Sequence, residues 1–214
     1  MAEFFLELFS EEIPPKLQIQ ARDNILNEFK ELFQKENIIF DKVNSSFSTP
    51  NRLVVYFKNI QKIVTKYPKE IRGPNTNSSK DALEGFLKSN NINIKSLYKR
   101  KSEKGEFYFF KTPKQNISTI DLLKGRLPNL LSNINWKKSM KWGGHNLYWG
   151  RPLKSILALF DGKVIPFDFH HLKSSNFTYI DKDYEEKKKS FNSYSSYLSY
   201  FKNLGVIIDQ KIRQ

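Results

Sequence analysis

The chain of 214 residues contains no cysteine, so disulfide bonds, thiolate metal sites and a cysteine nucleophile are all excluded. This absence fits a reducing cytoplasm, which is the location we expect. No apolar run approaches the ~20 residues that a membrane-spanning helix needs. The opening segment MAEFFLELFSEEIPP carries acidic residues where a secretion signal carries cations. We therefore expect neither export nor a membrane partner.

Signatures of an independent catalyst are also missing. The segments around Gly143-Gly144 and Gly150 have neither the phosphate-loop pattern nor the dinucleotide glycine spacing, and no serine stands in a G-x-S-x-G elbow. The histidines are His145, His170 and His171. Because we expect His170 and His171 on a strand, they would point to opposite faces and could not readily chelate one ion. The sequence predicts no catalytic residue, no metal and no cofactor on this chain.

What the chain does have is positive charge. It contains 36 Lys and Arg against 22 Asp and Glu, a formal net charge of +14. Such an excess favours a polyanionic partner, nucleic acid before an acidic membrane surface. The alternative is that the basicity is compositional, because Lys, Asn, Ile and Phe are all abundant, as expected from A/T-rich codons.

Cations and aromatic rings lie next to one another in two segments, at 98–108 and 136–151. Cations contact phosphates, and exposed rings stack on unpaired bases, as in the recognition of RNA loops and ends. Trp142 and Trp149 are equally well interpreted as core residues, and the lysines at 187–189 lie among acids as a solvated run. The candidate RNA-binding residues are Lys99, Arg100, Lys101, Lys104, Lys137, Lys138, Lys141, Trp142 and Arg151.

Four other charged residues lie at borders between expected elements and are candidates for structural or assembly roles. Glu11 and Glu12 follow the first expected strand and could bind an arginine, a metal or an amine. The favoured interpretation is that they precede a helix N-terminus, where the dipole stabilises negative charge. Arg52 and Arg72, like Arg151, stand within two residues of Pro or Gly at the border of an expected element. An arginine there either binds phosphate or holds a loop through carbonyl and carboxylate contacts.

The hydrophobic pattern predicts an α+β fold of antiparallel sheets with flanking helices, in two sub-domains. Residues 1–66 form the first, with order β-α-β-β, and residues 67–180 form the second, with hairpins at 97–111 and 153–168. Residues 181–214 are expected to be a helical segment.

Three details of this prediction can be examined in a structure. The alternation in residues 3–9 predicts a strand that is partly buried on both faces. Apolar residues at three- and four-residue spacing predict a helix over 16–35. A further helix opens at Ser118, and Gly125 and Pro128 should break or kink it.

Seven ordered segments resemble the N-terminal part of the beta subunit of bacterial two-subunit glycyl-tRNA synthetase. Two departures are Asn51, where the family more often has Arg, and Tyr179-Ile180-Asp181, where a Gly-His-Arg segment is usual. The matching segments are FLELFSEEIPPK (5–16), TPNRLVV (49–55), RGP (72–74), ALEGF (82–86), KGEFYF (104–109), KSMKWG (138–143) and RPLKSILALFDGKVIPF (151–167).

The resemblance implies a ligase fragment, truncated relative to the family, whose HD-like, body-tail and anticodon-binding parts would lie beyond Gln214. It implies an alpha subunit as partner in a heterotetramer, with the alpha subunit making glycyl-adenylate from glycine, ATP and Mg. The beta subunit would bind tRNA(Gly) and complete the cytoplasmic enzyme of protein synthesis. Two other functions are a purely structural interaction domain without a ligase role and, against the missing motifs, an independent enzyme.

Overall fold

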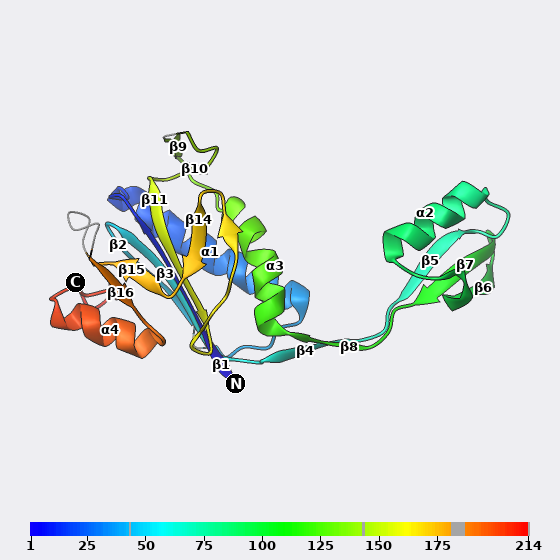
Figure 1. Cartoon of the computed structure of the whole chain (residues 1–214), viewed down its shortest axis with the longest axis horizontal. Coiled ribbons are helices and arrows are strands. Elements are labelled where there is room, and N and C mark those ends of the chain that lie inside the picture. The colour runs from blue at the N-terminus through cyan, green and yellow to red at the C-terminus, as the bar shows by residue number, and fades with distance from the viewer. Residues whose placement is uncertain (43, 143, 181–186, 214) are drawn as a thin grey trace. The chain divides into compact units, whose positions relative to one another are not determined.

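The computed structural model describes residues 1–42, 44–142, 144–180 and 187–213, and it contains two compact units. Unit 1 comprises Met1–Val64 and Ser118–Gln214, and unit 2 comprises Thr65–Ile117. The chain leaves unit 1 within β4 (Ile63–Lys66) and returns within β8 (Gln115–Ser118), and these two strands pair with each other. Figure 1 shows mixed helices and sheets, so the expected α+β class is confirmed.

Unit 1 is built on a seven-stranded sheet in the order β13-β14-β11-β1-β3-β2, with β12 pairing β11 at one end. The pairs within this sheet are antiparallel except β11 with β14, which is parallel. Its strands are β1 (Ala2–Ser10), β2 (Asn44–Thr49), β3 (Arg52–Ile60), β11 (Leu153–Phe160), β12 (Lys163–Val164), β13 (Asp168–Phe169) and β14 (Leu172–Ser175).

Strand β1 lies at the centre of this sheet, between β11 and β3. Every residue from Phe4 to Ser10 is buried, which confirms the prediction of a strand buried on both faces. One face, with Phe4, Leu6 and Leu8, belongs to the core under helices α1 (Pro15–Glu36) and α3 (Thr119–Ser132). The other face carries Phe5, which packs against helix α4 (Tyr194–Asn203). Helices thus cover both faces of unit 1's sheet.

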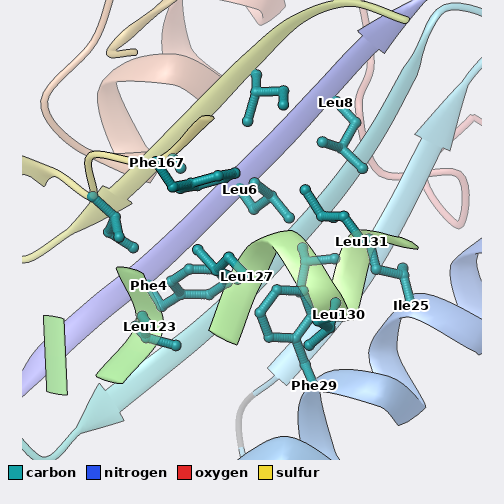
Figure 2. Packing of buried hydrophobic residues seen from close by; sticks show 14 of the residues in the cluster. Phe4, Leu6, Leu8, Ile25, Phe29, Leu123, Leu127, Leu130, Leu131 and Phe167 are labelled. Carbon is teal, nitrogen blue, oxygen red and sulfur yellow. The ribbon is translucent and has the colours of Figure 1, made fainter. Parts of the chain in front are cut away.

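Helix α1 presents the apolar face that its three- and four-residue spacing predicts. Ile25, Phe29 and Phe33 are fully buried, and the Phe29 ring centroid lies 4.9 Å from that of Phe4 on β1. Figure 2 shows this side of the core, where Phe29 and Ile25 approach the strand together with Leu127 and Leu131 of α3. The expected helix over 16–35 is therefore confirmed, with one more residue at each end.

Helix α3 departs from its sequence expectation, because it continues through both Gly125 and Pro128 to Ser132. The prediction that these residues break the helix is wrong in this respect. Leu123, Leu127 and Leu131 on its inner face are all 0% exposed. Burial of such a stripe stabilises a helix by several kcal/mol in total, about 1.5–3 for each large side chain, which offsets the roughly 3 kcal/mol or more that an interior proline costs.

The turn at Asp161-Gly162 joins β11 to β12, as the hairpin prediction requires. Both residues have positive φ, 52° and 76°, which is the conformation of the two-residue turn that Asp-Gly favours. The hairpin does not belong with residues 67–117, however, because β11 pairs with β1 in the middle of unit 1's sheet. The structure therefore places 118–180 with the N-terminal residues, and only 65–117 form the second unit.

Unit 2 is a three-stranded antiparallel sheet in the order β5-β7-β6, with one helix packed against it. The β6–β7 hairpin corresponds to the one expected at 97–111. None of its residues, 65–117, is fully buried. Its elements are β5 (Glu70–Asn75), α2 (Lys80–Asn90), a 3-10 turn (Ile94–Ser96), β6 (Leu97–Ser102) and β7 (Gly105–Lys111).

Unit 1 also contains two short hairpins, β9 (Met140–Lys141) with β10 (Tyr148–Trp149) and β15 (Phe177–Tyr179) with β16 (Lys188–Ser190). Of the helical segment expected at 181–214, residues 181–186 and 214 lie outside the described residues, and α4 forms its helical part. Within the part of the chain that the structure describes, no helix is both long and apolar enough to cross a membrane.

Candidate nucleic-acid interface

The β9–β10 hairpin carries the first expected basic and aromatic cluster. Trp149 is buried, with ring centroids 5.2 Å from Trp136 and 5.8 Å from Phe169. Gly150 packs so closely beneath Trp136 that an added Cβ would lie 2.3 Å from its Cε3 atom. Trp149 is therefore a core residue that anchors the hairpin, rather than an exposed ring that could stack on a base.

Trp142 has a different environment from Trp149, because it is only half-buried. Its ring stands edge-on to His171 at 5.0 Å and to His145 at 5.5 Å, and the two imidazoles stack at 3.9 Å. Burial, followed by the proximity of His145, lowers the pKa of His171, so its ring is neutral at neutral pH. His170 and His171 form the turn between β13 and β14 rather than a strand, so the expected placement on opposite strand faces is wrong.

Exposed cations surround this hairpin. Lys137 and Lys138 precede β9, and Lys141 pairs in register with Tyr148, whose side chain is 65% exposed. Arg151 behaves differently, since it is half-buried and donates from Nη1 to the carbonyl oxygen of Gly150 at 2.9 Å. We call Lys137, Lys138, Lys141, Trp142 and Tyr148 the β9–β10 patch, and Arg151 is not included in it.

The second cluster lies on the β6–β7 hairpin of unit 2, where Lys99, Arg100, Lys101 and Lys104 are all exposed. Alternation along β6 divides them between two faces of the sheet, as expected for a strand. Lys99 and Lys101 share a face with Leu97, which is paired with Phe110. Arg100 lies on the opposite face, so the four cations do not form one patch.

The face that carries Arg100 also carries Arg72, the border arginine of β5. The Arg72 guanidinium lies 3.6 Å from the centroid of the Phe107 ring, and Arg100 lies 5.9 Å from that of Phe109. Tyr98 stacks on Phe109 at 6.1 Å with an interplanar angle of 25°. We call Arg72, Tyr98, Arg100, Phe107 and Phe109 the arginine–aromatic face.

Arg52 makes carboxylate and carbonyl contacts, the second of the two roles considered for the border arginines. It is 4% exposed and pairs with Glu7 of β1 at 3.2 Å. Its Nη2 atom donates to the carbonyl oxygens of Tyr179 and Ile180 at 2.7 and 2.8 Å. Thr178 completes the network, donating to Glu7 and accepting from Arg52. Arg52 thus fastens β15 to the sheet and is not available to RNA.

The paired acids Glu11 and Glu12 are exposed at the end of β1. Glu11 lies 3.8 Å from Lys154 of β11, and the first turn of α1, which begins at Pro15, contains no acid. The Glu11 contact is therefore with a neighbouring strand. Among the residues described, no group of three or more His, Asp or Glu side chains could hold a metal ion.

Fold and surface together define a basic α+β protein with exposed cationic and aromatic surfaces on both units and a buried ion pair in one. The family model of the glycyl-tRNA synthetase beta subunit matches residues 4–214. The chain therefore belongs to the glycyl-tRNA synthetase beta subunit family, as the ordered segments indicated.

Curated relatives carry the same family description. Glycine–tRNA ligase beta subunits from Rickettsia canadensis (strain McKiel) and Rickettsia typhi (strain ATCC VR-144 / Wilmington) are each 34% identical to this chain, and one from Rickettsia bellii (strain OSU 85-389) is 32% identical. Each match covers 100% of this chain but 32% of the relative. The chain thus spans about a third of the length of these relatives.

Two sets of residues that shape the candidate site and the fold were not predicted from the sequence. Phe107 and Phe109 were expected only as part of a strand, and their place opposite Arg72 requires the β5–β7 register. Glu7 was also missed, although an acidic residue inside the apolar run FFLELF is itself a signal. A carboxylate in such a run needs a buried cationic partner, which Arg52 provides.

Proposed function

We propose that this chain is a portion of a glycine–tRNA ligase beta subunit that contributes tRNA binding and subunit assembly to the attachment of glycine to tRNA(Gly). The observation that carries the proposal is the family match across residues 4–214. The relatives are named glycine–tRNA ligase beta subunits, and a beta subunit implies an alpha subunit as partner. The cytoplasmic location expected from the sequence stays a prediction.

The charge and the exposed rings support the tRNA-binding half of this proposal. A net charge of +14 favours a polyanion, and the β9–β10 patch combines three exposed lysines with a half-buried tryptophan and an exposed tyrosine. Lysines position phosphates, and rings stack on bases that are not paired. The same features support RNA contact whether or not this portion also touches the alpha subunit.

The proposal divides chemistry between two chains. The alpha subunit would hold ATP, Mg and glycine and form the adenylate, while this chain holds the nucleic acid. The isolated chain should therefore give no glycine-dependent pyrophosphate exchange, whereas the complex with the alpha subunit should give it. Exchange by the isolated chain would contradict the division.

Direct binding is the central test. Affinity for tRNA, measured by fluorescence anisotropy, should fall linearly with salt on logarithmic axes because phosphate contacts release counterions. Undetectable or salt-insensitive binding, combined with co-purification of the alpha subunit, would instead favour the purely structural interaction domain.

A double charge reversal separates these two functions. Lys138→Glu with Lys141→Glu should weaken tRNA binding and leave co-purification with the alpha subunit intact. The matched control reverses Lys58 and Lys163, two exposed lysines at the opposite end of the sheet from the β9–β10 patch. Equal losses of tRNA affinity from the two double reversals would show that only the total charge of the chain matters, as the compositional alternative requires.

A further inference from the structure

Positive charge is concentrated in unit 2. Residues 65–117 hold twelve of the 36 Lys and Arg but five of the 22 Asp and Glu, a net charge of +7, which is half of the chain's +14 in a quarter of its length. Such a unit attracts polyanions strongly. The arginine–aromatic face lies within this unit, so its geometry does not depend on any other part of the chain.

The two faces of the unit 2 sheet differ in what covers them. Helix α2 packs on one face, where Phe86 lies so close to Gly73 that an added Cβ would be 2.9 Å from the ring. Ile71, Leu97 and Phe110 pair in register and share this face with Gly73. Within unit 2, α2 lies on one side of the three-stranded sheet (Figure 1). The registers place the arginine–aromatic face on the other side.

The arginine–aromatic face is accessible. The side chain of Arg100 is 63% exposed and Tyr98 is 40% exposed, Arg72 is exposed, and the two phenylalanines are half-buried. Each guanidinium lies over a ring, so the rings are separated by cations rather than sealed into a core. An apolar protein partner would leave these guanidinium groups desolvated without acceptors, which is costly.

An acidic side chain shapes this surface. Glu70 of β5 lies 3.0 Å from Arg100 Nη1 and 2.5 Å from the Tyr98 hydroxyl, which donates to it. It orients both side chains, while Lys111, its partner in register, keeps the surface net positive. Arg72 has its guanidinium over Phe107 and offers its donors to a ligand.

We propose that the arginine–aromatic face binds a single-stranded segment of RNA, with Tyr98 and Phe109 as stacking surfaces for bases. Arg72, held over the ring of Phe107, and Arg100 are the phosphate contacts. Rings on an exposed sheet can stack only on bases that are free of a duplex, whereas the arginines contact phosphates of any sequence. The inference rests on the proposed function, because it names where and in what form this chain would hold its nucleic acid.

The experiment uses the full chain and two probes, a fluorescent single-stranded oligoribonucleotide and the duplex that it forms with its complement. The unsubstituted chain should bind the single strand more tightly than the duplex. Arg72→Gln with Arg100→Gln should weaken single-strand binding roughly ten-fold or more and reduce the salt slope by about 1–2.

The matched control is Lys80→Gln with Lys88→Gln, which removes two charges from exposed lysines of helix α2 in the same unit. It should change single-strand affinity no more than about two-fold. Tyr98→Leu with Phe109→Leu should weaken single-strand binding by roughly ten-fold while leaving the salt slope unchanged, because stacking releases no counterions. Circular dichroism verifies that the variants fold, and the arginine pair tests the face even if the leucine pair does not fold.

Equal losses from the arginine and lysine pairs, or an unchanged affinity in the folded leucine pair, would overturn the inference. If the chain binds tRNA but the face variants bind it as the lysine control does, only this inference fails and the proposed function stands. If the unsubstituted chain binds neither tRNA nor the single strand, the proposed function fails with it.

Discussion

Unit 1 and unit 2 carry the same net charge of +7, but unit 1 has three times as many residues and a core in which Phe4, Phe29 and Leu127 are fully buried. Unit 2 has no fully buried residue, and its single helix covers one side of a three-stranded sheet. Its 53 residues are too few to bury a large core. The difference suggests that unit 1 provides stability and unit 2 provides accessible surface.

The largest contrast should come from the ion pairs. Arg52→Ala in unit 1 leaves Glu7 buried without its cationic partner, so we expect the free energy of unfolding to fall by about 3–5 kcal/mol. Chemical denaturation of the full chain measures this loss. Arg100→Ala, which breaks the exposed pair of unit 2, should cost no more than about 1 kcal/mol. Similar losses at the two sites would remove the distinction between the units.

Glycine substitutions should give the next largest contrast. Gly150→Ala forces a Cβ to within 2.3 Å of Trp136, a ring packed against the core, so we expect about 1–3 kcal/mol of destabilisation. Gly73→Ala presses on the half-buried Phe86 of α2, which can shift, so the loss should be smaller. Thermal or chemical unfolding of the two variants compares them directly, and a larger loss at Gly73 would contradict the contrast.

Alkaline pH should distinguish the units through their tyrosines. Burial, followed by the charge of Glu7, raises the pKa of Tyr197 well above 10.0, so its neutral form stabilises the folded state. That stability is fully present below pH 10.0 and is lost as the pH rises toward the folded-state pKa. Tyr197→Phe should flatten the alkaline decline of the unfolding free energy. Tyr98→Phe in unit 2 is the control and should leave most of the decline in place.

The smallest expected effect concerns Glu70 of unit 2. Its hydrogen bond with the Tyr98 hydroxyl is the main cause that raises the pKa of Tyr98. Glu70→Gln should move that pKa back toward 10.0, as measured by phenolate absorbance, while the free energy of unfolding at neutral pH stays nearly unchanged. A large loss of stability would mean that the exposed contacts of unit 2 hold its fold.

Local features of the fold could be predicted from the sequence because local chemistry determines them. The spacing in 16–35 specifies α1, and Asp161-Gly162 specifies a turn with positive φ. The partner of β11 could not be predicted, because its pairing with β1 joins distant segments whose apolar patterns fit many neighbours. For the same reason the extent of unit 2 was missed, although the hairpin within it was expected.

The candidate site was predictable only as a set of residue types. Sequence adjacency grouped Arg100 with Lys99 and Lys101, but strand alternation separates them and cross-strand register brings Arg100 and Arg72 onto one face. The sequence does not distinguish Arg52 from the other border arginines, because its buried ion pair with Glu7 joins two different strands. Spacing along one strand can indicate faces, whereas the residues that share a face across strands depend on pairings that a single sequence does not reveal.

Because β4 and β8 are hydrogen-bonded neighbours, the points where the chain departs from unit 1 and rejoins it are separated by about one strand spacing, roughly 5 Å. A short turn could close that gap and bypass residues 65–117 altogether. Unit 2 is thus an insertion between β4 and β8, which could be removed, exchanged or enlarged without changing the strand order of the sheet in unit 1. Substitutions in unit 2 are therefore constrained mainly by its own small sheet, while those in unit 1 must also preserve the large buried core.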